Sequence, residues 1–505
     1  MEWLKRLPLI VLLMGVGAVA MFAPAMHSYI VRDLETARAF FYSGIFFLFL
    51  FSMVSIATSN YRIRRPGRSH LISIFAMFAV LPAMLAVPVA EAVPDTAFSN
   101  AYVEMVSSLT TTGATLFEAE RLPPSVHLWR ALVGWLGGFF MWVAAIAIFA
   151  PLSLGGFEIV AATEAAREDK RGATRLDHLG EKAERLSRFA LRLAPIYGGL
   201  TVVLWVSLML AGDAPLVAIS HAMATLSTSG ISPIDGGVRE SSSGFGGELL
   251  ILLFLVFALS RLTFTSDGRQ DSWSALVKDP ELRLGLGLIV IIPLVLFARH
   301  WIATIEDGSE VSFLEGLVGL WGAVFTVASF LTTTGFESAG WGAARVWSGL
   351  DATGLVLLGL AVFGGGVATT AGGVKLLRVY ALVKHGQREM EKLVMPSSVG
   401  GSGQVARRFR RQGAYVAWVF FMLFALSIAV TSVLLAFFGL SFEDALVLTI
   451  ASLSTTGPLV EAASQSSIDL IALAPAAKAV FAAAMVLGRL ETLAIIALLN
   501  PEFWR

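Results

Sequence analysis

Long apolar runs recur along the whole sequence, and each is close to the ~20 residues that a helix needs to cross a bilayer. Shorter apolar stretches lie between some of these runs and have the length of re-entrant or buried helices. The long runs predict ten spanning helices, near 7–30, 39–59, 70–92, 128–152, 190–212, 246–265, 284–304, 347–384, 412–439 and 469–499. The short stretches predict four helices that do not cross, near 97–109, 214–226, 316–331 and 442–453. The pattern therefore predicts an all-α polytopic membrane protein.

The composition agrees with this class. Of 505 residues, 56% are hydrophobic and 15% are charged, whereas soluble domains carry about 25% charged residues. Lysine plus arginine equal aspartate plus glutamate at 37 each, so we expect no nucleic-acid partner. The absence of cysteine excludes disulfides and thiolate catalysis. The first apolar run predicts an uncleaved helix, with a signal peptide as the alternative.

The positions of lysine and arginine predict the orientation of the chain. These residues concentrate in alternate connecting segments, which the positive-inside rule assigns to the cytoplasm together with both termini. Acidic residues predominate on the opposite side, from which the four short helices enter. Arg407, Arg408, Arg410 and Arg411 form a basic cluster that indicates either positive-inside anchoring or binding to anionic lipid or an acidic partner.

Each short apolar stretch ends in a Thr/Ser-rich loop that closes with glycine. The four segments align without gaps: NAYVEMVSSLTTTGAT from Asn100, VAISHAMATLSTSGIS from Val217, GAVFTVASFLTTTGFE from Gly322 and DALVLTIASLSTTGPL from Asp444. All four have Ala twelve positions before the glycine, Leu four before it, Thr or Ser at −3 and −1, and Thr at −2. This recurrence predicts four covalently linked repeats of helix, re-entrant helix, loop and helix, preceded by two extra helices.

The loop composition predicts a cation pathway. Non-helical backbone at membrane depth must line a water-filled path or be buried in protein, and glycine permits a positive φ that turns neighbouring carbonyls inward. Four such loops around one axis would form rings of carbonyl oxygens that replace the hydration shell of an alkali cation such as K⁺. One copy alone could be an ordinary Thr/Gly turn. The predicted filter consists of Thr110, Thr111, Thr112, Gly113, Ser227, Thr228, Ser229, Gly230, Thr332, Thr333, Thr334, Gly335, Ser454, Thr455, Thr456 and Gly457.

The long run at 347–384 is interrupted by a glycine-rich segment, 364–373. Five of its ten residues are glycine, and each glycine in a helix costs about 1 kcal/mol relative to alanine. We expect an unwound segment that crosses the pathway on the cytoplasmic side; a patch of small residues for tight helix packing is the alternative. The residues concerned are Gly364, Gly365, Gly366, Thr369, Thr370, Gly372 and Gly373.

Arg489 places a charge inside the last apolar run, where a charge is expensive and usually functional. Glu491 is two positions away, and residues at i and i+2 do not share a helix face. We therefore expect Arg489 to point into the pathway or to contact the glycine-rich segment, with pairing to an acid on another helix as the alternative.

The four loops between paired helices resemble the superfamily of K⁺ transporters that includes TrkH, TrkG, KtrB and the plant HKT proteins. The two extra helices are similar to the TrkH/TrkG branch, and Gly488-Arg489-Leu490-Glu491 with Pro501-Glu502-Phe503-Trp504-Arg505 resembles that family's C-terminal pattern. The resemblance covers essentially the whole chain. It implies that 364–373 is an intramembrane gating loop, although Ala368-Thr369-Thr370-Ala371-Gly372-Gly373 departs from the usual G-S-T-x-G-G.

The resemblance also implies a homodimer and a cytosolic TrkA-type regulatory subunit that binds NAD or ATP. We expect no cofactor on this chain itself, K⁺ as the transported ion, and a location in the bacterial cytoplasmic membrane. The expected organisation is two extra helices in 1–66, repeat 1 in 67–160, a connector in 161–186, repeat 2 in 187–268, repeat 3 in 269–385, a linker in 386–410 and repeat 4 in 411–505.

The predicted function is therefore potassium uptake and not catalysis, because the soluble segments carry no nucleophile–base pair, metal cluster or phosphate-binding lysine loop. A Na⁺-coupled K⁺ symporter is one alternative. An alternating-access carrier is another, but it predicts two inverted halves, whereas this chain has four copies in one direction.

Overall fold

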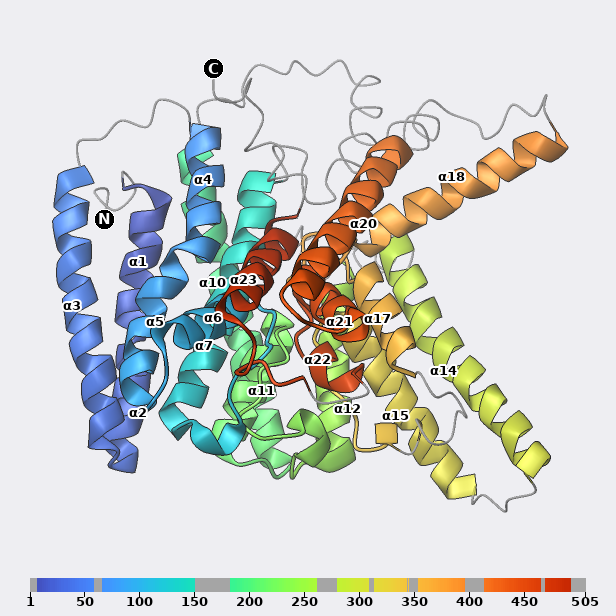
Figure 1. Cartoon of the computed structure of the whole chain (residues 1–505), viewed down its shortest axis with the longest axis horizontal. Coiled ribbons are helices and arrows are strands. Elements are labelled where there is room, and N and C mark those ends of the chain that lie inside the picture. The colour runs from blue at the N-terminus through green and yellow to red at the C-terminus, as the bar shows by residue number, and fades with distance from the viewer. Residues whose placement is uncertain are drawn as a thin grey trace.

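The computed structural model describes residues 7–58, 66–149, 182–260, 279–307, 313–342, 344, 353–395, 413–464 and 468–491. All regular elements in these ranges are helical (Figure 1). The helices outside the four that precede the Thr/Ser-rich loops include α1 (Leu9–Ala20), α2 (Phe22–Val31), α3 (Leu34–Thr58), α4 (Pro66–Ala79), α5 (Leu81–Ala92), α7 (Pro124–Ala144), α10 (Lys182–Leu210), α12 (Gly244–Leu255), α14 (Pro280–Asp307), α17 (Thr353–Phe363), α18 (Leu376–Val394), α20 (Ala414–Phe437) and α23 (Pro475–Leu490). The four short helices expected from the sequence are α6 (Phe98–Leu109), α11 (Pro215–Ser227), α15 (Phe313–Leu331) and α21 (Phe442–Leu453).

Seven helical stretches in the described residues are long and apolar enough to cross a membrane: Leu9–Val31, Leu34–Thr58, Ser69–Ala92, Pro124–Phe149, Arg188–Leu210, Pro280–Arg299 and Ala414–Phe437. The other three predicted spans are described in part, as α12, as α17 with α18, and as α23. The chain is thus a polytopic all-α membrane protein.

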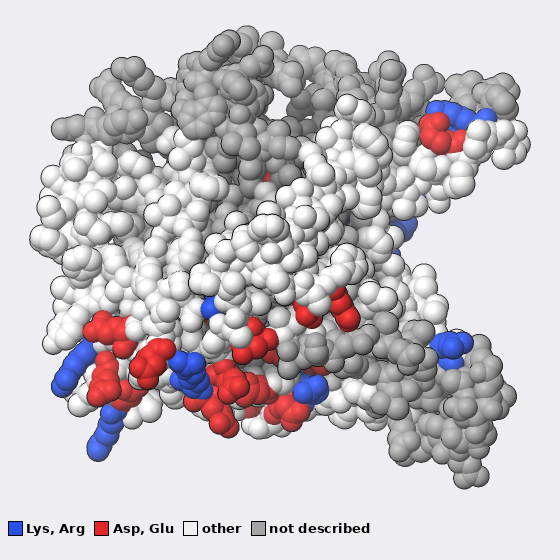
Figure 2. Space-filling model, viewed as in Figure 1, with Lys and Arg blue, Asp and Glu red and all other residues white. Residues whose placement is uncertain are grey.

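The surface of the bundle has the distribution expected of a membrane protein. Large apolar side chains such as Phe49 on α3 and Val295 on α14 are exposed, and lipid is the solvent that suits them. Figure 2 shows a broad band almost without charge, and below it Asp and Glu side chains, with some Lys and Arg among them, gathered along one end of the molecule. We call this end the acidic end.

Each short helix lies within a group formed by the helices before and after it. The groups are α5–α6–α7, α10–α11–α12, α14–α15–α17 and α20–α21–α23. The recurring alanines (Ala101, Ala218, Ala323 and Ala445) and leucines (Leu109, Leu226, Leu331 and Leu453) are all buried. These positions recur because the short helices pack into the interior of the bundle. Helices α1–α3 lie to one side, at the left of Figure 1, where α3 packs against α5 and α2 against α7.

The segment between α17 and α18 is not helical, and α18 leaves the bundle at a steep angle, at the upper right of Figure 1. Most of the expected connector and linker, including the Arg407–Arg411 cluster, lies outside the described residues, as does the end of the chain after Glu491.

Candidate functional site

Four buried loops, residues 110–113, 227–230, 332–335 and 454–457, lie against one another; we number them loops 1 to 4. The glycine that ends each loop abuts the next loop, or the residue directly after it, so closely that an added Cβ would overlap it. The contacts run from Gly113 to the Ser229 carbonyl, from Gly230 to the Thr334 carbonyl, from Gly335 to the Pro458 ring and from Gly457 to the Ala114 backbone. The four loops therefore form a closed ring in chain order.

The middle threonine of each loop has a left-handed backbone conformation. The φ angles are 56° for Thr111, 50° for Thr228, 58° for Thr333 and 53° for Thr455. A β-branched residue rarely adopts this region, and a residue held there costs on the order of 1–3 kcal/mol. Each threonine takes the place that glycine usually takes where a helix ends in a Schellman motif, as when the Thr112 amide donates to the Ser107 carbonyl at 2.9 Å. The chain thus turns sharply from helix into loop.

The hydroxyls that flank the middle threonine bond to each other in every loop. The distances are 2.8 Å for Thr110–Thr112, 3.0 Å for Ser227–Ser229, and 3.2 Å for both Thr332–Thr334 and Ser454–Thr456. The first hydroxyl also donates to the carbonyl four residues earlier, as from Thr110 to Val106 at 2.7 Å. This bonding explains why Thr or Ser recurs at −3 and −1.

Loop 4 departs from the symmetry expected from the sequence. Gly113, Gly230 and Gly335 have φ angles of 76°, 64° and 86°, but Gly457 does not have a positive φ. Pro458 follows it, and a residue before proline is restricted to extended conformations. The Gly457 amide instead donates to the Thr112 carbonyl at 2.5 Å, so loops 1 and 4 are joined directly.

The glycine-rich segment 364–373 lies against loops 2, 3 and 4. Thr228 donates to the Thr370 hydroxyl at 3.1 Å, and the Gly372 amide donates to the Thr333 hydroxyl at 2.7 Å. Gly372 also packs against the Thr455 hydroxyl. The hydroxyls of Thr111 and Thr455 are buried, and neither has a hydrogen-bond partner in the described part of the chain. The glycine-rich segment thus forms hydrogen bonds with two of the four middle threonines and packs against a third, Thr455.

The last described helix, α23, also contacts the glycine-rich segment, through Arg489. Arg489 is buried, and its Nη1 donates to the Thr370 carbonyl at 2.6 Å. This contact is one of the two arrangements expected from the sequence. Glu491 pairs with Arg378 of α18 at 2.7 Å, and the Arg378 guanidinium lies 3.7 Å from the centre of the Phe420 ring.

A cavity of about 300 Å³ opens beyond the four glycines and is lined by the carboxylates of Asp235, Glu337 and Glu461. Glu461 reaches solvent in this vestibule, yet the surrounding protein displaces enough water to raise its pKa, and the Asp235 charge raises it further. Arg239 lies 3.5 Å from Glu337 and offsets part of the negative charge. The vestibule still has an excess of carboxylates, which favours cations.

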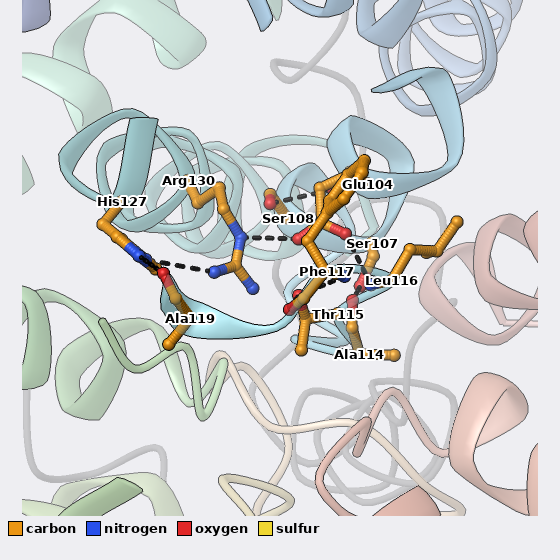
Figure 3. Close-up of polar contacts among 10 residues, drawn as sticks. All are labelled: Glu104, Ser107, Ser108, Ala114, Thr115, Leu116, Phe117, Ala119, His127 and Arg130. Carbon is orange, nitrogen blue, oxygen red and sulfur yellow. Dashed lines mark hydrogen bonds and ion pairs between the residues drawn. The ribbon is translucent and has the colours of Figure 1, made fainter. Parts of the chain in front are cut away.

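A buried charged pair behind loop 1 was missed by the sequence reasoning. Glu104 on α6 and Arg130 on α7 are 2.5 Å apart and almost inaccessible (Figure 3). The sequence feature that could have indicated this pair is Glu104 itself, a carboxylate at membrane depth on a short helix, nine positions before Gly113. The ring, by contrast, offers carbonyl and hydroxyl oxygens. These are the ligands that alkali cations accept, and the described residues hold no cluster of three His, Asp or Glu side chains for a transition metal.

Comparison with known proteins identifies relatives of this chain. A family model named TrkH and described as cation transport protein matches residues 282–503. The Trk system potassium uptake protein TrkH of Halomonas elongata is 30% identical over 86% of this chain and 84% of its own length. The protein of the same name from Escherichia coli K12 is 28% identical over 96% of both chains.

The crystal structure of the potassium transporter TrkH from Vibrio parahaemolyticus superposes with a TM-score of 0.78 at 26% identity, over the full length of both chains. The fold matches along the full length and the sequence over most of it, and the chain therefore belongs to the TrkH family.

Proposed function

We propose that this protein takes up K⁺ across the bacterial cytoplasmic membrane and that the ring of four loops is its selectivity filter. The observation that carries the proposal is the closed ring itself, in which four glycine-ended loops from one chain meet around a common centre. The backbone carbonyls of residues −3 to −1 and the free hydroxyls of Thr111 and Thr455 would replace water around the ion. Relatives along the whole chain are named potassium uptake proteins.

The glycine-rich segment is the proposed gate. Its contacts with loops 2, 3 and 4 support a position directly against the pathway. The hydrogen bond from Arg489 would hold it there, and the buried guanidinium would add a positive charge that opposes cation passage. Movement of this segment would open the pathway without any rearrangement of the ring.

The acidic end is the proposed outer face, with both termini in the cytoplasm. Carboxylates around the vestibule would raise the local concentration of cations at the entrance. The proposed division of the chain is that expected from the sequence, with repeat 1 in 67–160, repeat 2 in 187–268, repeat 3 in 269–385 and repeat 4 in 411–505.

The proposed assembly is a homodimer controlled by a cytosolic TrkA-type subunit, so that NAD or ATP would act through that second chain. The connector 161–186 and the basic cluster 407–411 are the proposed docking segments, as their charge and predicted cytoplasmic position suggest.

The test is ion flux in liposomes that contain the full chain. We expect K⁺ and Rb⁺ flux that exceeds Na⁺ flux, and loss of this preference in Gly113→Ser and Gly335→Ser, because a Cβ at either position strains a positive φ and overlaps the next loop. Gly198→Ser on α10 is the matched control, since nothing lies near its added Cβ. Equal K⁺ and Na⁺ flux in the unmodified chain and in both variants would contradict the filter assignment.

Two further measurements address the gate and the coupling. Deletion within 364–373 should raise K⁺ flux, and unchanged flux would argue against a gate at this position. A Na⁺ gradient that drives K⁺ accumulation would favour the Na⁺-coupled symporter over a channel-like pathway.

A further inference from the structure

We propose that Glu104 is a positioning residue that sets ion selectivity by holding residues 114–119, which follow loop 1, with Arg130 as its counter-charge. This inference rests on the proposed filter function. We use the term return limb for residues 114–119, which lead from Gly113 back to α7.

Glu104 joins two elements behind loop 1. Its Oε2 accepts a hydrogen bond from the Leu116 amide at 2.8 Å, and its Oε1 lies 2.5 Å from Arg130 Nε. Figure 3 shows the carboxylate between the return limb and the guanidinium. Both charged side chains are at most 3% exposed, and a buried carboxylate is tolerated when such partners compensate it.

Two neighbouring side chains extend this arrangement along the return limb. Ser107 donates to the Ala114 carbonyl at 2.6 Å, and His127 Nε2 lies 2.9 Å from the Ala119 carbonyl. Arg130 Nη1 lies 3.4 Å from His127 Nδ1, so the guanidinium links two of the attachments (Figure 3). Three backbone groups of the return limb are thus held by side chains of α6 and α7, and the first of them, the Ala114 carbonyl, directly follows the filter glycine.

In loops 2 and 3 the residue nine positions before the glycine also bonds to the segment that follows the glycine. His221 Nε2 lies 3.0 Å from the Ser232 hydroxyl behind loop 2. Thr326 accepts from the Ser338 amide at 3.2 Å behind loop 3. In loop 4 this position is the apolar Leu448, and Pro458 with α22 (Leu459–Ala462) follows the glycine instead. Loop 1 is the copy in which a carboxylate occupies this position.

Loop 3 has a second tether that supports the same principle. Glu248 of α12 is fully buried and accepts from the Ala339 amide and the Ser338 hydroxyl, both at 2.8 Å. Trp321 Nε1 donates to the same carboxylate at 2.6 Å. In the ring order, loops 1 and 3 are opposite each other, so carboxylates hold the segments that follow the filter glycine on two facing sides.

The Glu104 carboxylate has a second role, because it compensates the positive charge of Arg130. Arg130 lines the vestibule, where an uncompensated positive charge would repel the entering cation. Substitutions separate the two effects. Glu104→Gln keeps an acceptor for the Leu116 amide but leaves the Arg130 charge unbalanced, whereas Glu104→Ala removes both the acceptor and the charge.

The experiment measures K⁺ half-saturation and K⁺/Na⁺ selectivity of the full chain in liposomes. We expect Glu104→Ala to lower selectivity about tenfold, as for a lost buried hydrogen bond, while K⁺ flux persists. Glu104→Gln should keep the selectivity and raise the half-saturation concentration, more strongly at low ionic strength. Glu104→Gln combined with Arg130→Gln should restore the half-saturation. Glu443→Gln, an exposed position on α21, is the matched control.

Wild-type selectivity in a folded Glu104→Ala protein overturns the proposal. If Glu104→Ala does not fold, the test is the comparison of Glu104→Gln with the Glu104→Gln, Arg130→Gln double variant. Identical K⁺ half-saturation concentrations in these two proteins would overturn the proposal. Failure of the proposed filter function would give a different result, namely no preference for K⁺ over Na⁺ in the unmodified chain.

Discussion

The Arg489 guanidinium and the Thr370 backbone carbonyl are joined by a hydrogen bond of 2.6 Å across 119 positions of sequence. Nε and Nη2 of Arg489 are buried and have no hydrogen-bond partner in the described residues. The last helix thus supplies a buried positive charge and a single directional contact to the segment that lies against the four loops.

Removal of this contact should open the pathway more often. We expect Arg489→Gln to raise K⁺ flux several-fold, because the side chain loses both the charge and the donor geometry that hold Thr370. Liposome flux measures this, with Lys392→Gln on the exposed part of α18 as the control. A folded variant with wild-type or lower flux would contradict the role of Arg489.

The buried pair of Arg378 and Glu491 should behave differently from a surface pair. Removal of one partner leaves an uncompensated buried charge, so Glu491→Gln should lower the free energy of unfolding by about 3–5 kcal/mol. Thermal unfolding in detergent measures the loss. The pair of Arg388 and Glu391, whose carboxylate is exposed, is the control, for which we expect at most about 1 kcal/mol. Similar losses in the two pairs would show that burial of the Arg378 pair has little energetic effect.

Flux at low K⁺ concentration should depend on pH through Glu461. Its pKa is raised by the surrounding protein and by Asp235, and the ionised form, which attracts cations, predominates above that pKa. Flux should therefore fall as the pH decreases through the raised pKa, at a higher pH than an ordinary glutamate would give. Glu461→Gln should flatten this part of the profile, whereas Glu120→Gln, outside the vestibule, should not. An unchanged profile in Glu461→Gln would assign the titration to another group.

Ser441 caps α21 and should contribute modestly to stability. Its hydroxyl accepts from the Asp444 amide at 3.1 Å, and loss of such a cap typically costs about 1 kcal/mol. We expect Ser441→Ala to lower the unfolding temperature slightly and to leave the K⁺/Na⁺ selectivity unchanged, since the cap lies at the far end of the helix from loop 4. Altered selectivity would show that the start of α21 is coupled to the ring.

The sequence was sufficient for features that repeat or that depend on local chemistry. Apolar length placed the helices, and the four in-phase loops indicated a ring. The glycines at 364–373 indicated a break, and the structure has no helix between Phe363 and Leu376. The recurring alanine and leucine of each short helix are buried at the same point in every copy. Such patterns can be recognised because the same packing and turn requirements recur in four parts of one chain.

Contacts between distant residues could not be derived in this way. The spacing of Arg489 and Glu491 excluded a local pair, but nothing in the sequence pointed to Arg378 as the partner of Glu491. The alignment suggested four equal glycines, whereas Pro458 gives Gly457 another backbone conformation. Glu104 and Arg130 belong to different helices, and each alone reads as a single charge near the membrane.

The ring is built from one polypeptide, and each of its four loops can therefore be substituted without changing the other three. In an assembly of four identical chains, one substitution alters every wall at once. Here a carboxylate tethers loop 1, a histidine loop 2, a threonine with a carboxylate loop 3, and a proline follows the glycine of loop 4. Selection can therefore alter one loop while the other three keep their geometry, and ion selectivity can change through substitutions in a single loop.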